Sequence, residues 1–374
     1  MSGSENQSFE ARLPALRAAL ARVVGGGARA ATIRFGGEFA ADVDDAAETR
    51  KAIGYGEPLL FSLQDADGGE RRFVWHTVKA DDFGHDRRAD RAQNLLLAYK
   101  TFADLPRHVE AVDVGAIAPD GDLVSLHDCG EPYLITRYAP GAPYADDLRR
   151  LAGGAPLGER DRDRCARLAE YLVDLHRMPA ERPAMYTRAL RDVIGSGEGI
   201  YGIVDGYPED TPAAPPDRLR AIERACADYR WHLRGLEHRG VRVHGDFHPF
   251  NILFDEGDEL ALLDASRGCR GDAADDVCCL AINYVFFALA HPDAWEASLG
   301  ALWTRFWDRY LELSGDRELL VAAPLYLAWR ALVLACPAWY PDLGERERDA
   351  LLKLAERALA VGHFEPAWAE ELFS

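Results

Sequence analysis

Three polar side chains in the second half of the chain have the types and spacing that phosphoryl transfer requires. Asp246 and Asn251 are five positions apart, and Asp264 follows beyond a short hydrophobic hairpin. A carboxylate in the first position can accept a proton from an attacking hydroxyl, while an amide and a second carboxylate hold Mg²⁺ on nucleotide phosphates. Asp and Asn also build simple turns through bonds to their own backbone. That explanation accounts for any two of the three residues, but not for all three with strands between the last two.

A zinc site is the second chemistry that this segment suggests. His244 and His248 are four positions apart, which is the spacing of a helical zinc pair. However, Gly245 and Pro249 interrupt a helix, no Glu follows the first His, and no third ligand is nearby. We therefore expect His244 to support the loop by packing.

The first half of the chain has the order of elements that covers a nucleotide. Gly54 and Gly56 precede a predicted strand at 59–63, and a turn leads to a second predicted strand at 73–79 that ends in Lys79. Glycines allow the backbone to approach phosphate oxygens, and a lysine on a strand neutralises their charge. Each signal is weak alone, because most glycine pairs form turns and most lysines at strand ends are solvated. Their position upstream of the polar triad strengthens both.

The motif around Asp246 also carries a resemblance. The string H-G-D-F-H-P-x-N-I-L resembles the aminoglycoside phosphotransferase and choline kinase-like family, whose members are small-molecule relatives of protein kinases. The second acidic motif of that family is usually Asp-Trp-Glu or Asp-Phe-Glu. Here Asp264-Ala265-Ser266 keeps the carboxylate and lacks the aromatic residue and the second acid. The resemblance covers residues 50 to 340.

A third segment, 271–277, resembles the family's G-D-P-x-x-D-[LV] motif. The resemblance implies that Asp276 anchors the catalytic loop through backbone amides, and Asp272 is a candidate for the same structural task.

One predicted helix departs from the kinase-like pattern. Kinase-like folds place a Glu on this helix to pair with the strand lysine. The helix at 86–102 contains no Glu, so Asp90 is the nearest substitute and Asp86 the second. We expect Asp90 to pair with Lys79, although a surface position for Asp90 explains the sequence equally well.

The resemblance implies an α+β, two-lobed protein-kinase-like fold with the nucleotide between the lobes. We expect an N-terminal tail and helix at 1–30, a nucleotide-covering lobe with a small antiparallel sheet at 31–138, and a larger, mainly helical lobe at 139–374. The stretch 131–138 links the lobes and would border the adenine. Hydrophobic periodicity predicts helices at 217–238, 277–290, 293–313, 317–335 and 345–361.

Composition limits the possible partners. The net charge of −19 argues against nucleic acid, because phosphate contacts need clustered Lys and Arg. It would suit a cationic substrate, although acidic surfaces more often serve solubility alone. The seven cysteines are scattered and include no C-x-x-C pair. With a polar N-terminus and no apolar stretch of membrane-spanning length, the chain is expected to be cytoplasmic and to have no membrane partner.

The resemblance implies transfer of the γ-phosphoryl group of ATP, or GTP, to a hydroxyl of an aminoglycoside, choline, amino sugar or similar molecule. Asp246 would be the base or orienting carboxylate, Asn251 and Asp264 would hold Mg²⁺, and Lys79 would contact phosphates. Two other classes stay open: a nucleotide-binding homologue with little turnover, and a metal-dependent hydrolase. Retention of the whole triad argues against the first, and the hairpin of Lys79 would be unnecessary in the second.

Overall fold

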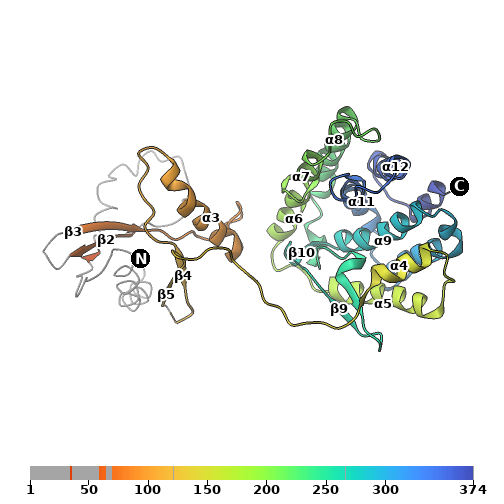
Figure 1. Cartoon of the computed structure of the whole chain (residues 1–374), viewed down its shortest axis with the longest axis horizontal. Coiled ribbons are helices and arrows are strands. Elements are labelled where there is room, and N and C mark those ends of the chain that lie inside the picture. The colour runs from red at the N-terminus through yellow and green to blue at the C-terminus, as the bar shows by residue number, and fades with distance from the viewer. Residues whose placement is uncertain (1–33, 36–58, 65–69, 121, 266, 374) are drawn as a thin grey trace. The chain divides into compact units, whose positions relative to one another are not determined.

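A computed structural model of the chain describes residues 34–35, 59–64, 70–120, 122–265 and 267–373. The chain divides into two compact units, Met1–Thr136 and Arg137–Ser374 (Figure 1). The predicted helix within 1–30 and the predicted glycine contacts at Gly54 and Gly56 lie outside the described residues. Helices and small antiparallel sheets together confirm the α+β class that the sequence indicated.

Unit 1 contains two small antiparallel sheets and one long helix. Its elements are β1 (Arg34–Phe35), β2 (Leu59–Gln64), β3 (Glu70–Trp75), α3 (Arg88–Thr101), η2 (Phe102–Asp104), β4 (Gly115–Ile117) and β5 (Leu123–Ser125). The strand order of the first sheet is β1-β2-β3, and β4 pairs with β5 in the second. The second sheet is therefore a single antiparallel hairpin.

The predicted end of the second strand at Lys79 is wrong. β3 stops at Trp75, which is paired with Leu59 at the start of β2. The ladder ends where its partner strand begins, so residues 76–80 continue without regular structure. Lys79 is exposed and lies in this connecting segment instead of on the strand.

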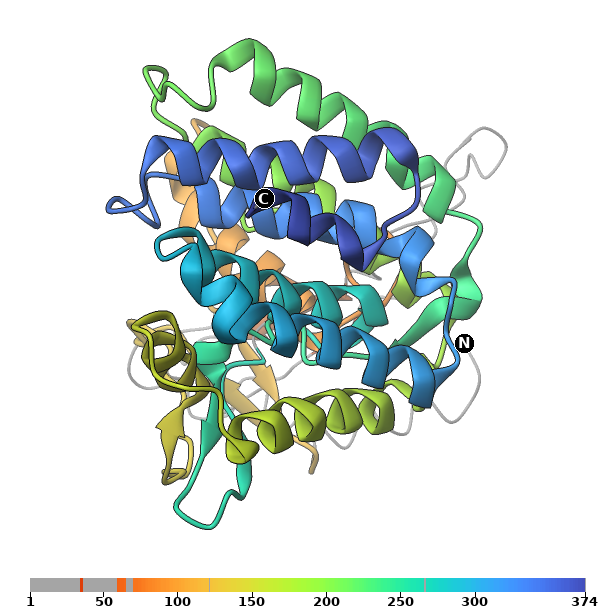
Figure 2. The same ribbon diagram turned by 90° about the vertical axis from the view of Figure 1, so that its right-hand side faces the viewer.

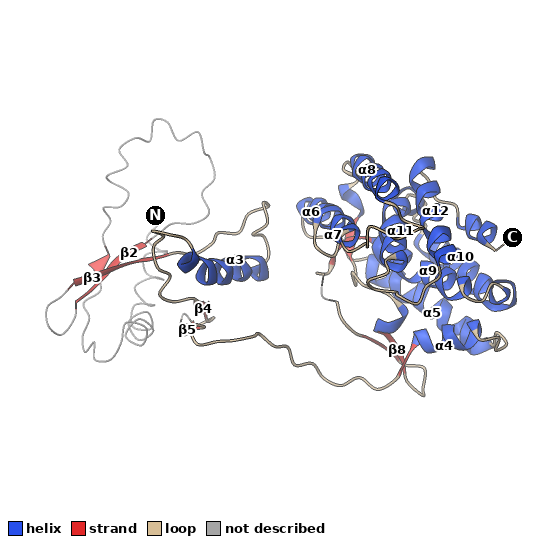
Figure 3. Cartoon of the chain, turned by 45° about the horizontal axis from the view of Figure 1, so that its top comes forward, coloured by secondary structure: helices blue, strands red, loops and turns tan. Residues whose placement is uncertain are grey.

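Unit 2 is mainly helical (Figure 3). Its helices are α4 (Tyr144–Ala152), α5 (Glu159–His176), α6 (Pro183–Gly195), α7 (Ile200–Asp205), α8 (Pro216–Leu233), α9 (Ala273–Leu289), α10 (Gly300–Ser314), α11 (Leu319–Ala335) and α12 (Glu345–Val361). The shorter helical turns are η3 (Glu237–Arg239), η4 (Pro249–Asn251), the π-helical η5 (Trp295–Leu299) and η6 (Pro366–Leu372). The strands are β6 (Ala142–Pro143), β7 (Gly240–Arg242), β8 (Ile252–Phe254), β9 (Leu260–Leu262) and β10 (Arg270–Asp272).

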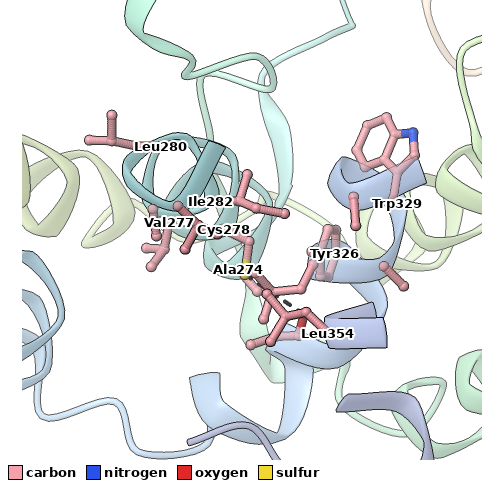
Figure 4. Close-up of a cluster of buried hydrophobic side chains, with 14 of the residues drawn as sticks. Ala274, Val277, Cys278, Leu280, Ile282, Tyr326, Trp329 and Leu354 are labelled. Carbon is pink, nitrogen blue, oxygen red and sulfur yellow. Dashed lines mark hydrogen bonds between the residues drawn. The ribbon is translucent and has the colours of Figure 1, made fainter. Parts of the chain in front are cut away.

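Two apolar helices, α9 and α11, form the centre of unit 2. α11 packs against both α9 and α12, while α10 packs against α5 and α9 (Figure 2). A helix that is apolar on all sides is stable only when other elements surround it. Ile282 of α9, Tyr326 of α11 and Leu354 of α12 meet in one buried cluster (Figure 4). Burying each large apolar side chain stabilises the fold by about 1.5–3 kcal/mol.

Local capping explains one shifted boundary. The sequence predicted a helix at 277–290, whereas α9 begins at Ala273. Asp272 is the N-cap, and its carboxylate accepts the Ala274 N–H at 2.9 Å. Arg239 donates two bonds to the same carboxylate, at 2.8 and 2.9 Å. The helix therefore starts directly after β10, and its first turn reaches the loop that carries Asp246.

Candidate active site

The backbone of the loop that carries Asp246 is fixed by Asp276, in the first turn of α9. The Asp276 carboxylate accepts the backbone N–H groups of His244 at 2.7 Å and Gly245 at 2.8 Å. His176 lies 3.2 Å from the same carboxylate through Nε2. Burial opposes the ionised form, but His176 and the two amides outweigh it and lower the pKa of Asp276. A buried anion therefore holds the loop in place.

Gly245 allows two loops to approach each other. Its φ is +85°, and a Cβ atom there would lie 3.0 Å from the backbone oxygen of Gly268. Both the conformation and the close approach favour glycine. This contact brings the loop after Asp264 next to the loop of Asp246.

His244 supports the same loop from its inner side. Its side chain is buried, its Nδ1 lies 3.2 Å from the backbone nitrogen of Asp246, and its ring packs edge-on against Phe247. The ring of Phe247 is fully buried and stacks on Tyr171. These contacts hold the backbone on both sides of Asp246.

The two carboxylate oxygens of Asp246 have different neighbours. Oδ1 is 3.0 Å from Arg330 Nη1 and 3.2 Å from Arg267 Nη2. Oδ2 lies 3.3 Å from the side-chain nitrogen of Asn251 and 3.4 Å from His248 Nε2. Burial opposes ionisation here too, but the hydrogen bond from His248 and the charges of Arg330 and Arg267 hold the pKa of Asp246 well below its ordinary value. The group is an anion with one tightly bound oxygen.

Arg330, Arg267 and Asp275 were missed by the sequence reasoning. Arg330 is buried in α11 and bonds Asp275 at 2.9 Å as well as Asp246. Both guanidinium groups lie over the ring of Trp329. The distance from Cζ to the ring centroid is 4.2 Å for Arg330 and 4.4 Å for Arg267. A signal was present, because Arg330 is the one charged residue in the 17-residue apolar segment that forms α11.

The β8–β9 hairpin brings Asn251 and Asp264 together. Ile252 pairs with Leu262, and the Leu263 N–H donates to the Asn251 carbonyl at 2.9 Å. Asp264 is therefore the residue directly after a backbone bond to Asn251. It is exposed and has a φ of +50°, a conformation that Asp adopts more readily than most residues.

Asn251 and Asp264 carry the kinds of oxygen atom that Mg²⁺ takes as ligands. The Asn251 side-chain nitrogen donates to the Asp246 carbonyl at 3.1 Å, which leaves the amide oxygen as an acceptor. Asp264 contributes an exposed carboxylate. Mg²⁺ typically takes one or two carboxylates and completes its shell with water and phosphate oxygens. In the described part of the chain, no group of three or more His, Cys, Asp or Glu could hold a metal ion.

A row of aromatic rings begins beside Asp246. The centroid of the Phe250 ring is 5.7 Å from that of His248 and 6.5 Å from that of Phe287, and the rings of Phe287 and Phe286 are 5.6 Å apart. Tyr340 continues the row at 5.1 Å from Phe286. Phe250 is 37% exposed and the last three rings are partly exposed, so the row offers an apolar face close to the Asp246 carboxylate.

The predicted nucleotide contacts of unit 1 have a different setting. Asp90 is in the first turn of α3, where its carboxylate accepts the Arg87 backbone N–H at 2.9 Å and pairs with the Arg87 guanidinium at 3.0 Å. These bonds satisfy the start of the helix in the manner of an N-terminal cap. The structure thus gives the Asp90 carboxylate a capping contact, and its pairing with Lys79 stays a prediction.

Comparison with known proteins identifies the class. A model of the phosphotransferase enzyme family matches residues 88–313. The match covers more than half of the chain, so this protein belongs to the phosphotransferase enzyme family. The resemblance seen in the sequence is thereby confirmed. A comparison with curated proteins gives no match.

Several solved structures are similar to the chain. A glucosamine kinase in complex with glucosamine, ADP and inorganic phosphate is 22% identical, with a TM-score of 0.37; the match covers 59% of this chain and 57% of that kinase. The chain thus spans less than two thirds of that protein. An aminoglycoside-3'-phosphotransferase of type VIII is 20% identical over 93% of this chain and 99% of its own, with a TM-score of 0.31. Choline kinase LicA from Streptococcus pneumoniae is 13% identical over 86% and 98%, with a TM-score of 0.34.

Among the described residues, none of the helices combines the length and apolar character needed to cross a bilayer.

Proposed function

We propose that this phosphotransferase moves the γ-phosphoryl group of ATP, or GTP, to a hydroxyl of a small molecule. The observation that carries the proposal is the convergence of Asp246, Asn251 and Asp264. Asn251 bonds Asp246 through its side chain and Leu263, the neighbour of Asp264, through its backbone. One amide residue therefore joins the carboxylate that would face the acceptor to the carboxylate that would face the metal.

Asp246 is the residue that would bind the acceptor hydroxyl. Its carboxylate is 21% exposed and anionic, so it can accept the hydroxyl proton or orient the hydroxyl for in-line attack. Its fixed backbone matters, because positioning accounts for much of the rate in phosphoryl transfer.

Asn251 and Asp264 would hold Mg²⁺ on the nucleotide phosphates. When bound, the metal neutralises charge on the phosphate oxygens. Asp264 supplies the negative charge at this position, and Asn251 supplies a neutral oxygen. The backbone bond from the Leu263 N–H to the Asn251 carbonyl holds the two residues close together.

Unit 1 would supply the remaining phosphate contacts. Lys79 would neutralise phosphate charge, Asp90 would orient Lys79, and the backbone at Gly54 and Gly56 would approach the phosphates. The exposed position of Lys79 suits a group that binds an anionic ligand.

The acceptor would be small. Gly271 follows Asp264 by seven positions and already belongs to β10, so no long activation segment stands between them to support a peptide. The partly exposed aromatic row beside Asp246 favours an acceptor with an apolar ring face, because sugar and aromatic rings can pack on such side chains. Amino sugars and aminoglycosides have such ring faces and are the classes to test first, and amino alcohols, which lack rings, complete the panel.

The test is ADP release from Mg·ATP and from Mg·GTP across a panel of these compounds. We expect at least one panel member to raise ADP release well above the rate with water alone, and Asp246→Asn to remove the increase. Tight Mg·ATP binding with no turnover for any acceptor would instead support a nucleotide-binding homologue. Phosphate release that is independent of acceptor would support a hydrolase.

A further inference from the structure

A single buried arginine on α11 contacts the Asp246 carboxylate. Arg330 is 6% exposed, and it stands alone among apolar residues in a helix that otherwise supplies core side chains. Burying a charged group is costly unless partners compensate for the lost hydration. Its compensation comes from Asp246 at 3.0 Å and Asp275 at 2.9 Å, together with a longer contact of 3.4 Å to the Gly245 carbonyl.

These contacts treat the two oxygens of Asp246 unequally. Arg330 and Arg267 both approach Oδ1, at 3.0 and 3.2 Å. The neighbours of Oδ2 are 3.3 and 3.4 Å away and are side chains of Asn251 and His248, neither of which is a guanidinium. The bond from Arg330 is the shortest of the four contacts, and its donor carries a full charge. Oδ1 is therefore the more firmly held oxygen, and Oδ2 is the oxygen whose longer contacts a hydroxyl can replace.

Two adjacent acids in the first turn of α9 divide the work of positioning. Asp276 binds the loop backbone at His244 and Gly245. Asp275 binds Arg330, which in turn binds the side chain of Asp246. Both acids belong to one turn of α9. The same helix therefore positions the loop backbone before Asp246 and, through Arg330, the Asp246 side chain.

We propose that Arg330, held by Asp275, is a positioning residue that fixes the Asp246 carboxylate so that Oδ2 receives the acceptor hydroxyl. The proposal rests on the proposed function, and it deepens it by assigning each carboxylate oxygen a task. Loss of Arg330 would let the carboxylate rotate about its side-chain bonds, which lowers the fraction of molecules in the reactive arrangement. The nucleotide side, built on Asn251 and Asp264, would be untouched.

The test compares Arg330→Lys with a matched control. Lysine keeps the charge but has one nitrogen in place of the fork that bridges Asp246 and Asp275. Arg218→Lys is the control, because Arg218 also bridges two acids, Asp349 and Glu356, and also bonds the Ala213 carbonyl. With Mg·ATP and the panel compound of highest turnover, we expect Arg330→Lys to lower kcat tenfold or more while leaving the KM for Mg·ATP within twofold. Arg218→Lys should leave kcat within twofold.

A second variant reaches Arg330 through its other partner. Asp275→Asn removes the charge that holds Arg330 without touching Asp246, and we expect it to lower kcat in the same direction. The double variant Arg330→Lys/Asp275→Asn should lose less than the product of the two single losses, because both act through one contact. Multiplicative losses would overturn the proposed relay.

The dependence on Asp246 is tested in the Asp246→Asn background. If Arg330 acts through Asp246, adding Arg330→Lys should change the residual rate less than twofold, whereas a merely structural role would lower it again. An undiminished effect in that background, or an equal loss of kcat in Arg218→Lys, would overturn the proposal.

Calorimetry separates failure of this proposal from failure of the proposed function. We expect the wild-type protein, Arg330→Lys and Asp275→Asn to bind Mg·ATP with the same affinity within twofold. Wild-type protein that binds no nucleotide and turns over no acceptor would contradict the proposed function and remove this proposal with it. Normal binding and normal kcat in Arg330→Lys would contradict the positioning role alone.

Discussion

The two units differ in how they hold their candidate functional residues. In unit 2, Asp276 binds the backbone amides just before Asp246, and Arg330 binds the Asp246 side chain. Asp276 and Arg330 both belong to helices of the buried core. In unit 1, Lys79 lies in an exposed segment without regular structure. The helix of Asp90, α3, contains no fully buried residue. One side of the proposed reaction is thus built into a core, and the other is presented on exposed segments.

This difference predicts how variants behave. Changes around Asp246 disturb buried charges, so they affect stability and turnover together unless the replacement preserves the charge balance. Changes in unit 1 affect exposed groups, so their stability cost is small and their functional effect stands alone. Variants in both units can test that separation.

Removal of the Asp246 charge should have the largest effect on turnover. Asp246→Asn should lower kcat by about 100-fold or more, the usual scale for a positioned base, while Mg·ATP affinity stays unchanged. Steady-state kinetics and calorimetry measure the two quantities. Near-normal turnover by a folded Asp246→Asn protein would contradict the role of Asp246 as the base or orienting carboxylate.

Removal of the Asp264 carboxylate should act on the nucleotide instead. Asp264→Ala should abolish Mg²⁺-dependent ATP binding, because this carboxylate carries the charge that faces the metal, while Asn251 is neutral. Asp264 is exposed, so the melting temperature should change little. Titration of Mg·ATP at constant magnesium is the measurement, and unchanged affinity would show that the Asp-Ala-Ser motif does not hold metal.

Replacement of Asp276 should mainly reduce stability. An Asn at this position directs an NH₂ group or a weaker acceptor at the His244 and Gly245 amides, so unfolding free energy should fall by about 3 kcal/mol. The measurement is chemical denaturation at neutral pH, with Asp272→Asn as a second buried acid for comparison. An unchanged denaturation midpoint would contradict the anchoring role.

The same residue predicts a pH dependence. The pKa of Asp276 is lowered in the folded protein by His176 and two backbone amides, against the effect of burial. Its contribution to stability is therefore complete above the pKa of an Asp in the unfolded chain, about 4. The contribution is lost as pH falls through the lower pKa of the folded state. Below about pH 4, the stability of the wild-type protein should fall toward that of Asp276→Asn. Parallel curves for the two proteins would contradict this linkage.

Asp90 should give the smallest effect and the cleanest separation. Asn can still accept the Arg87 N–H, so Asp90→Asn should leave stability within about 0.5 kcal/mol, whereas Asp90→Ala should cost about 1 kcal/mol through loss of the cap. If Asp90 also orients Lys79, Asp90→Asn should lower kcat several-fold at unchanged stability. Unchanged kcat would show that the carboxylate only caps α3.

The sequence predicted the parts of the site that lie within one short segment. The triad and the hairpin between Asn251 and Asp264 are local, because turn residues and alternating strands specify them over a few positions. Arg330 could not be placed in this way. It comes to Asp246 from 84 positions away through the packing of α11 on α9, and periodicity does not determine which side chains meet across such a contact.

The local predictions that were wrong failed for similar reasons. The strand ending at Lys79 was extended too far because the β-branched residues Thr77 and Val78 continue the strand pattern past Trp75, the last residue of β3 that pairs with β2. The start of α9 was placed too late because the capping role of Asp272 depends on burial with Arg239. Pairing and burial partners, which single-segment patterns do not contain, set both boundaries.

The central claim is that this chain transfers phosphate to a small-molecule hydroxyl at Asp246. The most direct measurement is ³¹P NMR of the wild-type protein with Mg·ATP and each acceptor of the panel, followed by the same experiment with Asp246→Asn. The account predicts a new phosphomonoester signal that grows with ADP for at least one acceptor and is nearly absent for the variant. Growth of inorganic phosphate alone, or an equal phosphomonoester signal from Asp246→Asn, would contradict it.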